Sequence, residues 1–328
     1  MTKLINNPNS VENDLFSAFA SLYHDSIYRI EDTGVFVSKE EYGSVAVVSG
    51  GGSGHEPAHI GFVGQGMLKA CAMGAVFVPP TPDEVCQMIC HADEGKGVFV
   101  IIKNFIEDVT SFNLGIDMAR QQGIKVASII VNDDCSVEES SFKKRRRGVA
   151  GTLFIHKIVG SAAQAGKSLD ELKVIAESAL SELNTLGVAL SSGTLPGKAS
   201  PMFDLEFGHV SYGMGIHGES GYRIEDFRGS AELANEIWNK LKSQCDVKKG
   251  EHVAILVNGL GGTPEMELLI FYHDLMQLIE LDNIECSFVK VGSLMTSMDM
   301  KGVSVSCLPL KDSMWLEYLN KKTNAPSW

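Results

Sequence analysis

VVSGGGSGHEPAH, residues 47–59, is the most unusual stretch of this chain and decides the fold expected around it. The apolar run from Ser44 to Val48 predicts a strand, and Pro57 suits the first turn of a following helix. Four glycines lie between them, and they remove the Cβ atoms that would keep a ligand away from the backbone. We expect the amides of this turn to face an oxygen-rich ligand. The alternative is a tight turn that binds nothing.

Three known motifs can be compared with this stretch. A P-loop requires Gly-Lys-Ser/Thr after its glycines, and a dinucleotide fingerprint requires glycines at its first, third and sixth places. Neither pattern is present. His55-Glu56-Pro57-Ala58-His59 does match the H-E-x-x-H pattern of zinc enzymes. Zinc is a minor alternative, because Pro57 interrupts the helix that would align the histidines and no third ligand follows at a metalloprotease spacing.

Strand and helix patterns alternate after the glycine stretch. Thr81-Pro82-Asp83-Glu84 is a capping box that begins a helix, and the apolar runs 97–102 and 124–131 are typical of buried strands. The alternation predicts a largely parallel sheet, whose strand ends bring their loops together. Residues 49–55, 103–108 and 132–134 should therefore meet. Lys103, Glu107 and Asp108 would bring a cation and two carboxylates to this edge, and a solvated loop is an equal alternative for them.

The length of 328 residues predicts two domains, because single cores rarely grow to this size. A segment rich in Ser, Gly and Pro, residues 191–201, places the boundary just before it, near residue 185. We predict an N-terminal domain of residues 1–185 and a C-terminal domain of residues 186–328, with strands at 253–257, 284–291 and 303–308. Both domains are expected to be α/β, with two or three layers around mainly parallel or mixed sheets.

Composition argues against several classes of function. The net charge of −13 repels nucleic-acid phosphate and anionic membranes, so neither direct nucleic-acid contact nor membrane binding is expected. Seven cysteines without C-x-x-C spacing indicate reduced thiols in a cytoplasmic protein. No stretch approaches the ~20 apolar residues of a membrane span, and the N-terminus has no secretory signal pattern. We expect a cytoplasmic protein without a bound cofactor or metal.

A second unusual segment is Gly213-Met214-Gly215-Ile216-His217-Gly218-Glu219, in which glycines lie on both sides of a histidine. A reactive histidine benefits from such neighbours because a ligand can approach its ring. A histidine in the core does not require glycine at the neighbouring positions. The segment by itself leaves a reactive and a structural role for His217 equally open.

The two glycine-rich segments, with four others, resemble the dihydroxyacetone kinase substrate-binding subunit family over nearly the whole chain. The others are Lys103-Asn104, Arg146-Arg147-Gly148, His156-Lys157 and MTSMDM at 295–300. The resemblance implies two α/β domains of that family's fold, a homodimer, and dihydroxyacetone held as a covalent hemiaminal on His217. It further implies that the substrate is surrounded by Gly52, Ser53, Gly54, His55, Lys103 and Asp108. In the kinases, residues matching His55 and Asp108 assist deprotonation of the attacking hydroxyl, and a separate subunit holds the nucleotide.

The sequence departs from the kinase pattern beside the expected substrate. The kinases usually contain Lys-Asn-Tyr-Thr-Gly-Asp where this chain has Lys103-Asn104-Phe105-Ile106-Glu107-Asp108, and residues 74–80 differ as well. Bulk and negative charge at Ile106 and Glu107 should obstruct a polyphosphate donor. The resemblance therefore favours a non-catalytic branch of the family, which binds dihydroxyacetone and acts as coactivator of a TetR-type transcription regulator. The alternative is an active substrate-binding subunit of a phosphotransferase-dependent kinase, whose partner is the nucleotide-binding kinase subunit.

Overall fold

The computed structural model describes residues 2–136 and 146–328, and within these ranges the chain forms two compact units. The N-terminal unit comprises Thr2–Val131, Thr152–Ser178 and Lys321–Trp328. The C-terminal unit comprises the described part of Asn132–Gly151 together with Ala179–Asn320. Each unit is thus assembled from discontinuous segments, and the linear boundary near residue 185 stays a prediction.

The N-terminal unit is built on a six-stranded sheet with the order β1-β2-β4-β3-β5-β6. Its parallel part is formed by β4, β3, β5 and β6, while β1 and β2 continue it as an antiparallel edge. The predicted parallel sheet is therefore present. The strands are β1 (Ile27–Arg29), β2 (Val35–Ser38), β3 (Ala46–Ser53), β4 (Ala70–Val76), β5 (Val98–Lys103) and β6 (Val126–Val131).

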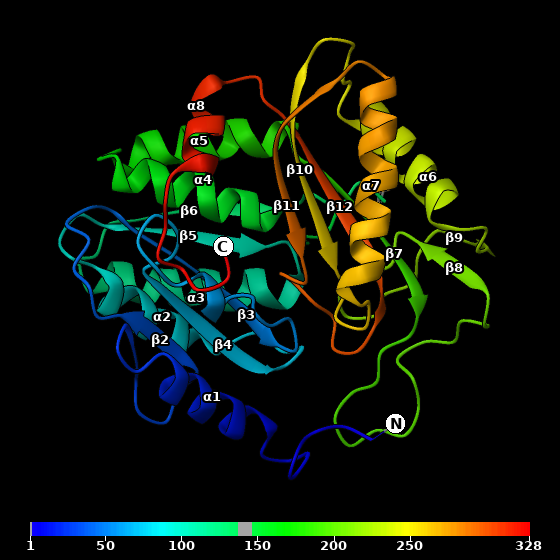
Figure 1. Cartoon of the computed structure of the whole chain (residues 1–328). Helices are drawn as coiled ribbons and strands as arrows, with labels where there is room; N and C mark the ends of the chain where they lie inside the picture. The colour runs from blue at the N-terminus through cyan, green and yellow to red at the C-terminus, as the bar shows by residue number, and fades with distance from the viewer. Residues whose placement is uncertain (1, 137–145) are drawn as a thin grey trace. The chain divides into compact units, whose positions relative to one another are not determined.

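Helices cover both faces of this sheet, so the N-terminal unit has three layers. Figure 1 shows α2 (Pro82–Ala92) and α3 (Ile106–Gln121) on one face and α4 (Thr152–Gln164) on the other. The capping box predicted at Thr81 is confirmed, since the Thr81 side chain accepts from the Glu84 amide and the Glu84 carboxylate accepts from the Thr81 amide. The other helices that include residues of this unit are α1 (Val11–Leu22) and α5 (Leu169–Glu182).

The glycine stretch differs from its prediction in two respects. First, β3 does not end near Val48 but continues through the glycines to Ser53, paired in parallel with β4. Second, Pro57 begins no α-helix, and the segment contains a single 3₁₀ turn, Ile60–Phe62. The Gly61 carbonyl, which would serve a continuing helix, instead accepts a hydrogen bond from the Ser327 amide of the C-terminal tail at 2.8 Å.

The C-terminal unit contains a six-stranded mixed sheet with the order β11-β10-β12-β7-β8-β9. Strands β10 and β11 are parallel, and the other neighbouring pairs are antiparallel. The three strands predicted for this half are confirmed, as is the α/β fold class with mainly parallel or mixed sheets. The strands are β7 (Asn184–Ser191), β8 (His209–Tyr212), β9 (Arg223–Asp226), β10 (His252–Gly259), β11 (Glu285–Gly292) and β12 (Lys301–Pro309).

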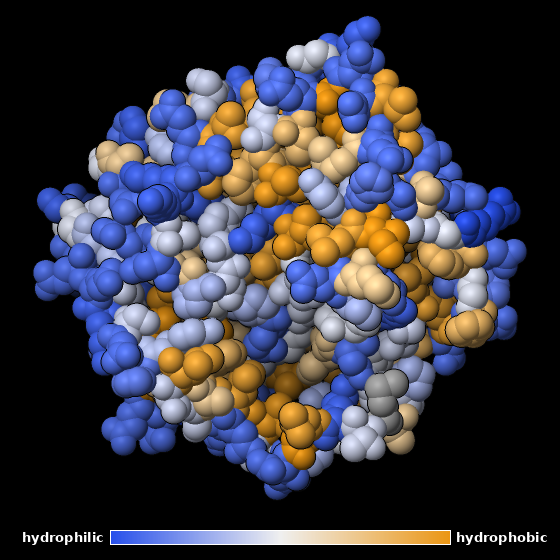
Figure 2. Space-filling view, in the orientation of Figure 1, coloured by the Kyte–Doolittle hydropathy of each residue, from blue (hydrophilic) through white to orange (hydrophobic). Residues whose placement is uncertain are grey.

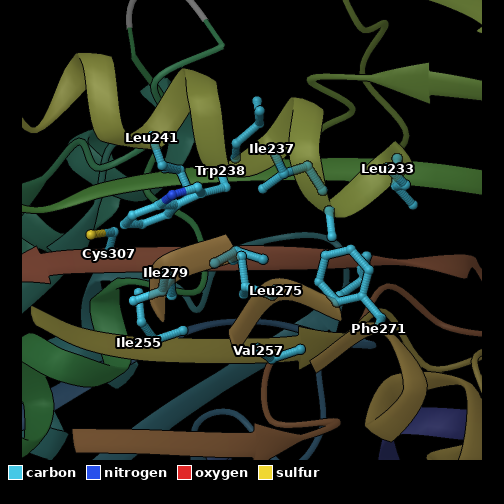
Figure 3. Packing of buried hydrophobic residues seen from close by; sticks show 14 of the residues in the cluster. Leu233, Ile237, Trp238, Leu241, Ile255, Val257, Phe271, Leu275, Ile279 and Cys307 are labelled. Carbon is cyan, nitrogen blue, oxygen red and sulfur yellow. The ribbon is translucent and has the colours of Figure 1, made fainter. Parts of the chain in front are cut away.

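Two helices, α6 (Ser230–Gln244) and α7 (Glu265–Leu281), pack together on this sheet, and α8 (Ser313–Asn320) packs on β11. Figure 3 shows how Trp238 of α6 and Leu275 of α7 meet side chains of β10 and β12 in a continuous apolar core. The Trp238 indole donates to the Asp282 carboxylate at 2.7 Å, so the ring is buried with its N–H satisfied.

The outer side of α7 is less polar than that of a typical surface helix. Figure 2 shows apolar surface over the position of this helix, in agreement with the exposure of Met266, Leu269 and Ile270. Apolar residues on both sides of α7 do not make it a membrane helix. Within the described ranges, no helix is long and apolar enough to cross a bilayer.

We predict that Leu275→Ala destabilises the protein by about 2–5 kcal/mol, because Leu275 is fully buried in this core and its removal leaves a cavity. Leu269→Ala on the same helix is the matched control. Leu269 is 47% exposed, and its replacement should change the free energy of unfolding by no more than about 0.5 kcal/mol. Urea denaturation monitored by tryptophan fluorescence measures both values, and equal losses would contradict the packing described.

Candidate functional site

Two of the predicted loops meet at the carboxyl ends of β3 and β5. Lys103 is the last residue of β5 and Asp108 lies in the first turn of α3, and both side chains are buried. The Lys103 Nζ donates to the Gly50 carbonyl at 2.9 Å, and it lies 3.0 Å from His59 Nε2 and 3.8 Å from Asp108 Oδ1. The structure therefore brings the predicted cation and carboxylate together, against the strand of glycines.

Burial dominates the electrostatics of this group. It lowers the pKa of the Lys103 ammonium, while the neighbouring Asp108 carboxylate acts in the opposite direction. The pKa of His59 lies well below its ordinary value because of burial and then the Lys103 charge, so His59 is neutral at physiological pH. Lys103 is thus a buried cation whose partners are a carbonyl, a neutral imidazole and one carboxylate.

Gly51 makes room for this arrangement. A Cβ at Gly51 would lie 2.1 Å from Lys103 Nζ and 3.3 Å from Asp108 Oδ1, and the backbone there has a φ of +154°. The missing side chain therefore admits charged groups of the protein itself. This role differs from the one inferred from the sequence, in which the glycines serve the approach of a ligand.

The other residues predicted on this stretch also have partners within the N-terminal unit. The Ser53 hydroxyl donates to the Gly74 carbonyl at 2.6 Å, and the Gly54 amide donates to the Glu56 carboxylate at 2.9 Å. The oxygen-rich acceptor expected for these amides is, at Gly54, a neighbouring side chain. His55 is buried and stacks on Phe77, with ring centroids 4.9 Å apart and an interplanar angle of 15°. Gly52 lies on β3 and pairs with Gly74 of β4.

The two residues that depart from the kinase pattern lie on the solvent side of Asp108. Ile106 is 70% exposed and Glu107 is exposed as well, whereas Asp108 is only 5% exposed. All three lie in the first turn of α3. Bulk and a negative charge therefore stand next to the buried carboxylate, at the outer surface of the unit.

His217 lies in the C-terminal unit, on the connection between β8 and β9. Its Nδ1 is 3.1 Å from Glu219 Oε1, and its backbone amide donates to Glu219 Oε2 at 3.0 Å. Burial raises the pKa of Glu219, but the hydrogen bond from His217 and the Arg147 charge outweigh burial and lower it to about 2. Because an ionised carboxylate can only accept, Nδ1 carries the proton of the neutral ring and Nε2 keeps its lone pair.

Arg147 supports Glu219 from the other side, which the sequence did not reveal. Its guanidinium lies 3.9 Å from Glu219, forms a 2.6 Å ion pair with Asp134 and donates to the Gly213 carbonyl at 2.7 Å. Arg147 belongs to the segment Arg146-Arg147-Gly148, which is part of the family resemblance. The position of Arg147 in the sequence does not indicate that Glu219 is its partner. The third predicted loop, residues 132–134, thus contributes Asp134 to the C-terminal unit.

Gly215 has a role beside His217 that parallels that of Gly51. A Cβ at Gly215 would lie 1.9 Å from Glu219 Oε2 and 2.4 Å from Arg147 Nη1. The Ser297 hydroxyl, within the motif at 295–300, donates to the Ile216 carbonyl at 2.5 Å and fixes the same turn. A glycine before His217 therefore lets the carboxylate reach the imidazole.

The zinc alternative finds no support in the described ranges 2–136 and 146–328. No three His, Cys, Asp or Glu side chains there are grouped as a metal ion would require. His59, the second histidine of the H-E-x-x-H pattern, directs its Nε2 toward the Lys103 ammonium, and Glu56 accepts from the Gly54 amide.

Comparison with known proteins decides the family. A family model described as the Dak1 domain matches residues 17–327. The chain belongs to the Dak1 family. The Lactococcus lactis protein named PTS-dependent dihydroxyacetone kinase, dihydroxyacetone-binding subunit DhaK is 46% identical over 99% of this Dak1 chain and 98% of its own length. The DhaKLM operon coactivator DhaQ of the same organism is 44% identical over 99% of this chain and all of its own.

A solved structure agrees with this assignment. The structure named dihydroxyacetone kinase operon co-activator Dha-DhaQ superposes on this chain with a TM-score of 0.92 at 44% identity. The match covers 96% of this chain and 97% of the chain in that structure. Relatives named as kinase subunits and as a coactivator are thus similar to this Dak1 chain at nearly equal identity.

We predict that Gly215→Ala separates the His217–Glu219 pair of this Dak1 chain, because the added methyl group would overlap the carboxylate and the guanidinium. Histidine ring ¹⁵N NMR should show His217 protonated at Nδ1 in the wild type and a mixture of both tautomers in the variant. His217→Ala identifies the signals. A variant spectrum identical to the wild type would contradict the assigned hydrogen bond.

Proposed function

We propose that this Dak1 chain binds dihydroxyacetone as a hemiaminal on His217 and, without transferring phosphate itself, acts as coactivator of a TetR-type transcription regulator. The observation that supports the covalent step is the Glu219 carboxylate at 3.1 Å from His217 Nδ1. This contact places the proton of the neutral ring on Nδ1, so that the lone pair, which is the nucleophile of the proposed step, is at Nε2. The name of the DhaK relative, a dihydroxyacetone-binding subunit, supports dihydroxyacetone as the ligand, and the name of the DhaQ relative supports the coactivator role.

The chemistry of the step follows from the tautomer. The Nε2 lone pair attacks the carbonyl carbon, so an N–C bond forms while the C=O π bond breaks and its electrons go to oxygen. The ring becomes an imidazolium whose Nδ1–H stays hydrogen-bonded to Glu219, and the oxygen takes up a proton from solvent. Loss of the Nδ1 proton restores a neutral ring, so the net change moves one proton from nitrogen to oxygen. Glycerol lacks an electrophilic carbon, so this step selects ketones over polyols.

The proposed lack of phosphoryl transfer is supported by the first turn of α3. Exposed Ile106 and Glu107 stand where the kinases carry a small polar residue and a glycine, beside the buried Asp108. A carboxylate at this place repels a polyphosphate, and the isoleucine side chain adds bulk. Both effects act on a phosphate donor, and neither acts on a small neutral ketone.

A protein partner is part of the proposal, because a net charge of −13 opposes direct contact with DNA. A TetR-type regulator would supply the DNA contacts, and this chain would report the ligand to it. The roles of Gly52, Ser53, Gly54, His55, Lys103 and Asp108 in ligand binding, and the homodimer, stay predictions from the resemblance.

The second candidate function is that of an active substrate-binding subunit of a phosphotransferase-dependent dihydroxyacetone kinase. Two observations favour it. His55, Asp108 and His217, the three residues expected to react, are all present. The DhaK subunits of Lactococcus lactis and Listeria innocua are 46% and 41% identical to this chain. The partner would then be the nucleotide-binding kinase subunit.

We expect intact-mass spectrometry to detect a dihydroxyacetone adduct on the wild-type protein. No adduct is expected on His217→Ala, because that variant lacks the nucleophile. His209→Ala, which removes the partly exposed histidine that begins β8, is the matched control and should keep the adduct. An adduct unaffected by His217→Ala would refute the site.

A phosphoryl-transfer assay separates the two candidate functions. With dihydroxyacetone, the nucleotide-binding subunit and its phosphate source, we expect the wild type to form dihydroxyacetone phosphate at least ~100-fold more slowly than an active kinase subunit, because the bulk of Ile106 and the charge of Glu107 oppose the phosphate donor. The double variant Ile106→Thr, Glu107→Gly should gain rate if the exposed turn is the obstacle. Wild-type turnover at ordinary kinase rates would contradict the coactivator proposal.

A further inference from the structure

Lys103 is a fully buried lysine, and one of its partners is His59. The family resemblance assigns no role to His59. The Lys103 side chain is 1% exposed, and the second-nearest polar atom to its Nζ after the Gly50 carbonyl is His59 Nε2, at 3.0 Å. His59 is itself completely buried, in the turn that leads from the glycine strand to Ile60–Phe62. A buried ammonium depends on such acceptors, because it has no water to replace them.

The geometry fixes the protonation of His59. An ammonium has only donors, so Nε2 must accept from it and Nδ1 must carry the ring proton. Nδ1 has no hydrogen-bond partner within the described ranges, and neither has either ring nitrogen of His156. The His59 and His156 rings lie with their centroids 5.2 Å apart, and both are completely buried. Two neighbouring buried imidazoles therefore lie near Lys103, and His59 is the one in contact with it.

We infer that His59 is a positioning residue for Lys103: its neutral Nε2 orients the buried ammonium and leaves one N–H for an oxygen of the ligand. The inference rests on the proposed binding of dihydroxyacetone. Two N–H bonds of Lys103 are directed to Gly50 and His59, while Asp108 Oδ1, at 3.8 Å, is beyond hydrogen-bond distance. The third N–H can therefore serve a carbonyl, alkoxide or hydroxyl oxygen.

A neutral acceptor does what a carboxylate could not do at this place. A second carboxylate against Lys103 would cancel its charge and weaken its attraction for a ligand oxygen that carries negative charge. An imidazole whose pKa is lowered by burial stays neutral, so it orients the ammonium and leaves its charge in place. Burial and the Lys103 charge hold the pKa of His156 at about 3, so the residue behind His59 is also neutral.

The charged and titratable groups around Lys103 come from three parts of the N-terminal unit. Asp108 faces it from α3, His59 and His55 belong to the segment after β3, and His156 lies on α4. Within residues 2–136 and 146–328, Asp108 is the one carboxylate among them. Removal of the His59 acceptor would therefore leave the ammonium with fewer partners, which favours its neutral form.

The test compares His59→Leu with His59→Gln in the full chain. Glutamine can place an acceptor near the position of Nε2, whereas leucine fills a similar volume without one. Affinity for dihydroxyacetone is measured by isothermal titration calorimetry from about pH 7 to about pH 10. Because the pKa of Lys103 is lowered by burial, binding that needs its charge weakens as the pH rises through that pKa. We expect His59→Leu to move this alkaline loss of affinity to lower pH by about one unit or more, and so to weaken binding roughly 10-fold or more at a pH above the midpoint of the wild-type loss. His59→Gln should stay close to the wild type.

Controls separate this inference from the proposed function. Lys103→Met should abolish the alkaline loss, and thermal melting shows whether each variant folds. If His59→Leu does not fold, His59→Asn replaces it, since asparagine places its acceptor near Nδ1 and not near Nε2. Wild-type protein that binds no dihydroxyacetone would refute the proposed function. If the wild type and His59→Leu, or His59→Asn in its place, bind dihydroxyacetone with the same pH dependence, the role inferred for His59 is overturned. The proposed function is not affected by that result.

Discussion

The burial of the Lys103 ammonium is the constraint on which the N-terminal unit depends. A charge without water needs acceptors on several sides, and these come from three different places: the Gly50 carbonyl on β3, His59 in the turn after it, and Asp108 on α3. The carboxyl ends of β3 and β5 and the start of α3 must therefore lie together. The glycine strand, which first indicates a ligand site, is in large part a means of admitting this cation.

The two candidate groups of the Dak1 chain follow one physical plan. In each, the buried or half-buried side chain of a candidate site residue contacts a second residue: Lys103 contacts His59, and His217 contacts Glu219. In each, a glycine leaves the space that the pair requires, since a Cβ at Gly51 or Gly215 would overlap a charged group. The partners differ in charge. A neutral imidazole adds no opposing charge to the Lys103 ammonium, and the Glu219 carboxylate places the proton of a neutral His217 ring on Nδ1.

Under the proposed function, the difference between a ligand sensor and an enzyme rests on few residues of this chain. The groups that would react are all in the chain, and the surface turn that carries Ile106 and Glu107 distinguishes it from the kinase pattern. Small changes outside a buried site can stop a second substrate without disturbing the first, because a phosphate donor is large and highly charged. The near-equal identity to relatives named DhaK and DhaQ agrees with such a small difference.

The sequence by itself determined the α/β class, the parallel strands β3, β5 and β6 and the capping box at Thr81, because local periodicity and residue type carry this information. It also singled out Lys103, Asp108 and His217 as candidate site residues, and their roles stay predictions. It did not show that β3 continues to Ser53, that no helix follows Pro57, or that His59 and Arg147 contact Lys103 and Glu219. Only the tertiary structure decided these features. They depend on hydrogen bonds and close approaches between residues far apart in the chain, such as the Ser327 amide on the Gly61 carbonyl, and no local pattern encodes such partners.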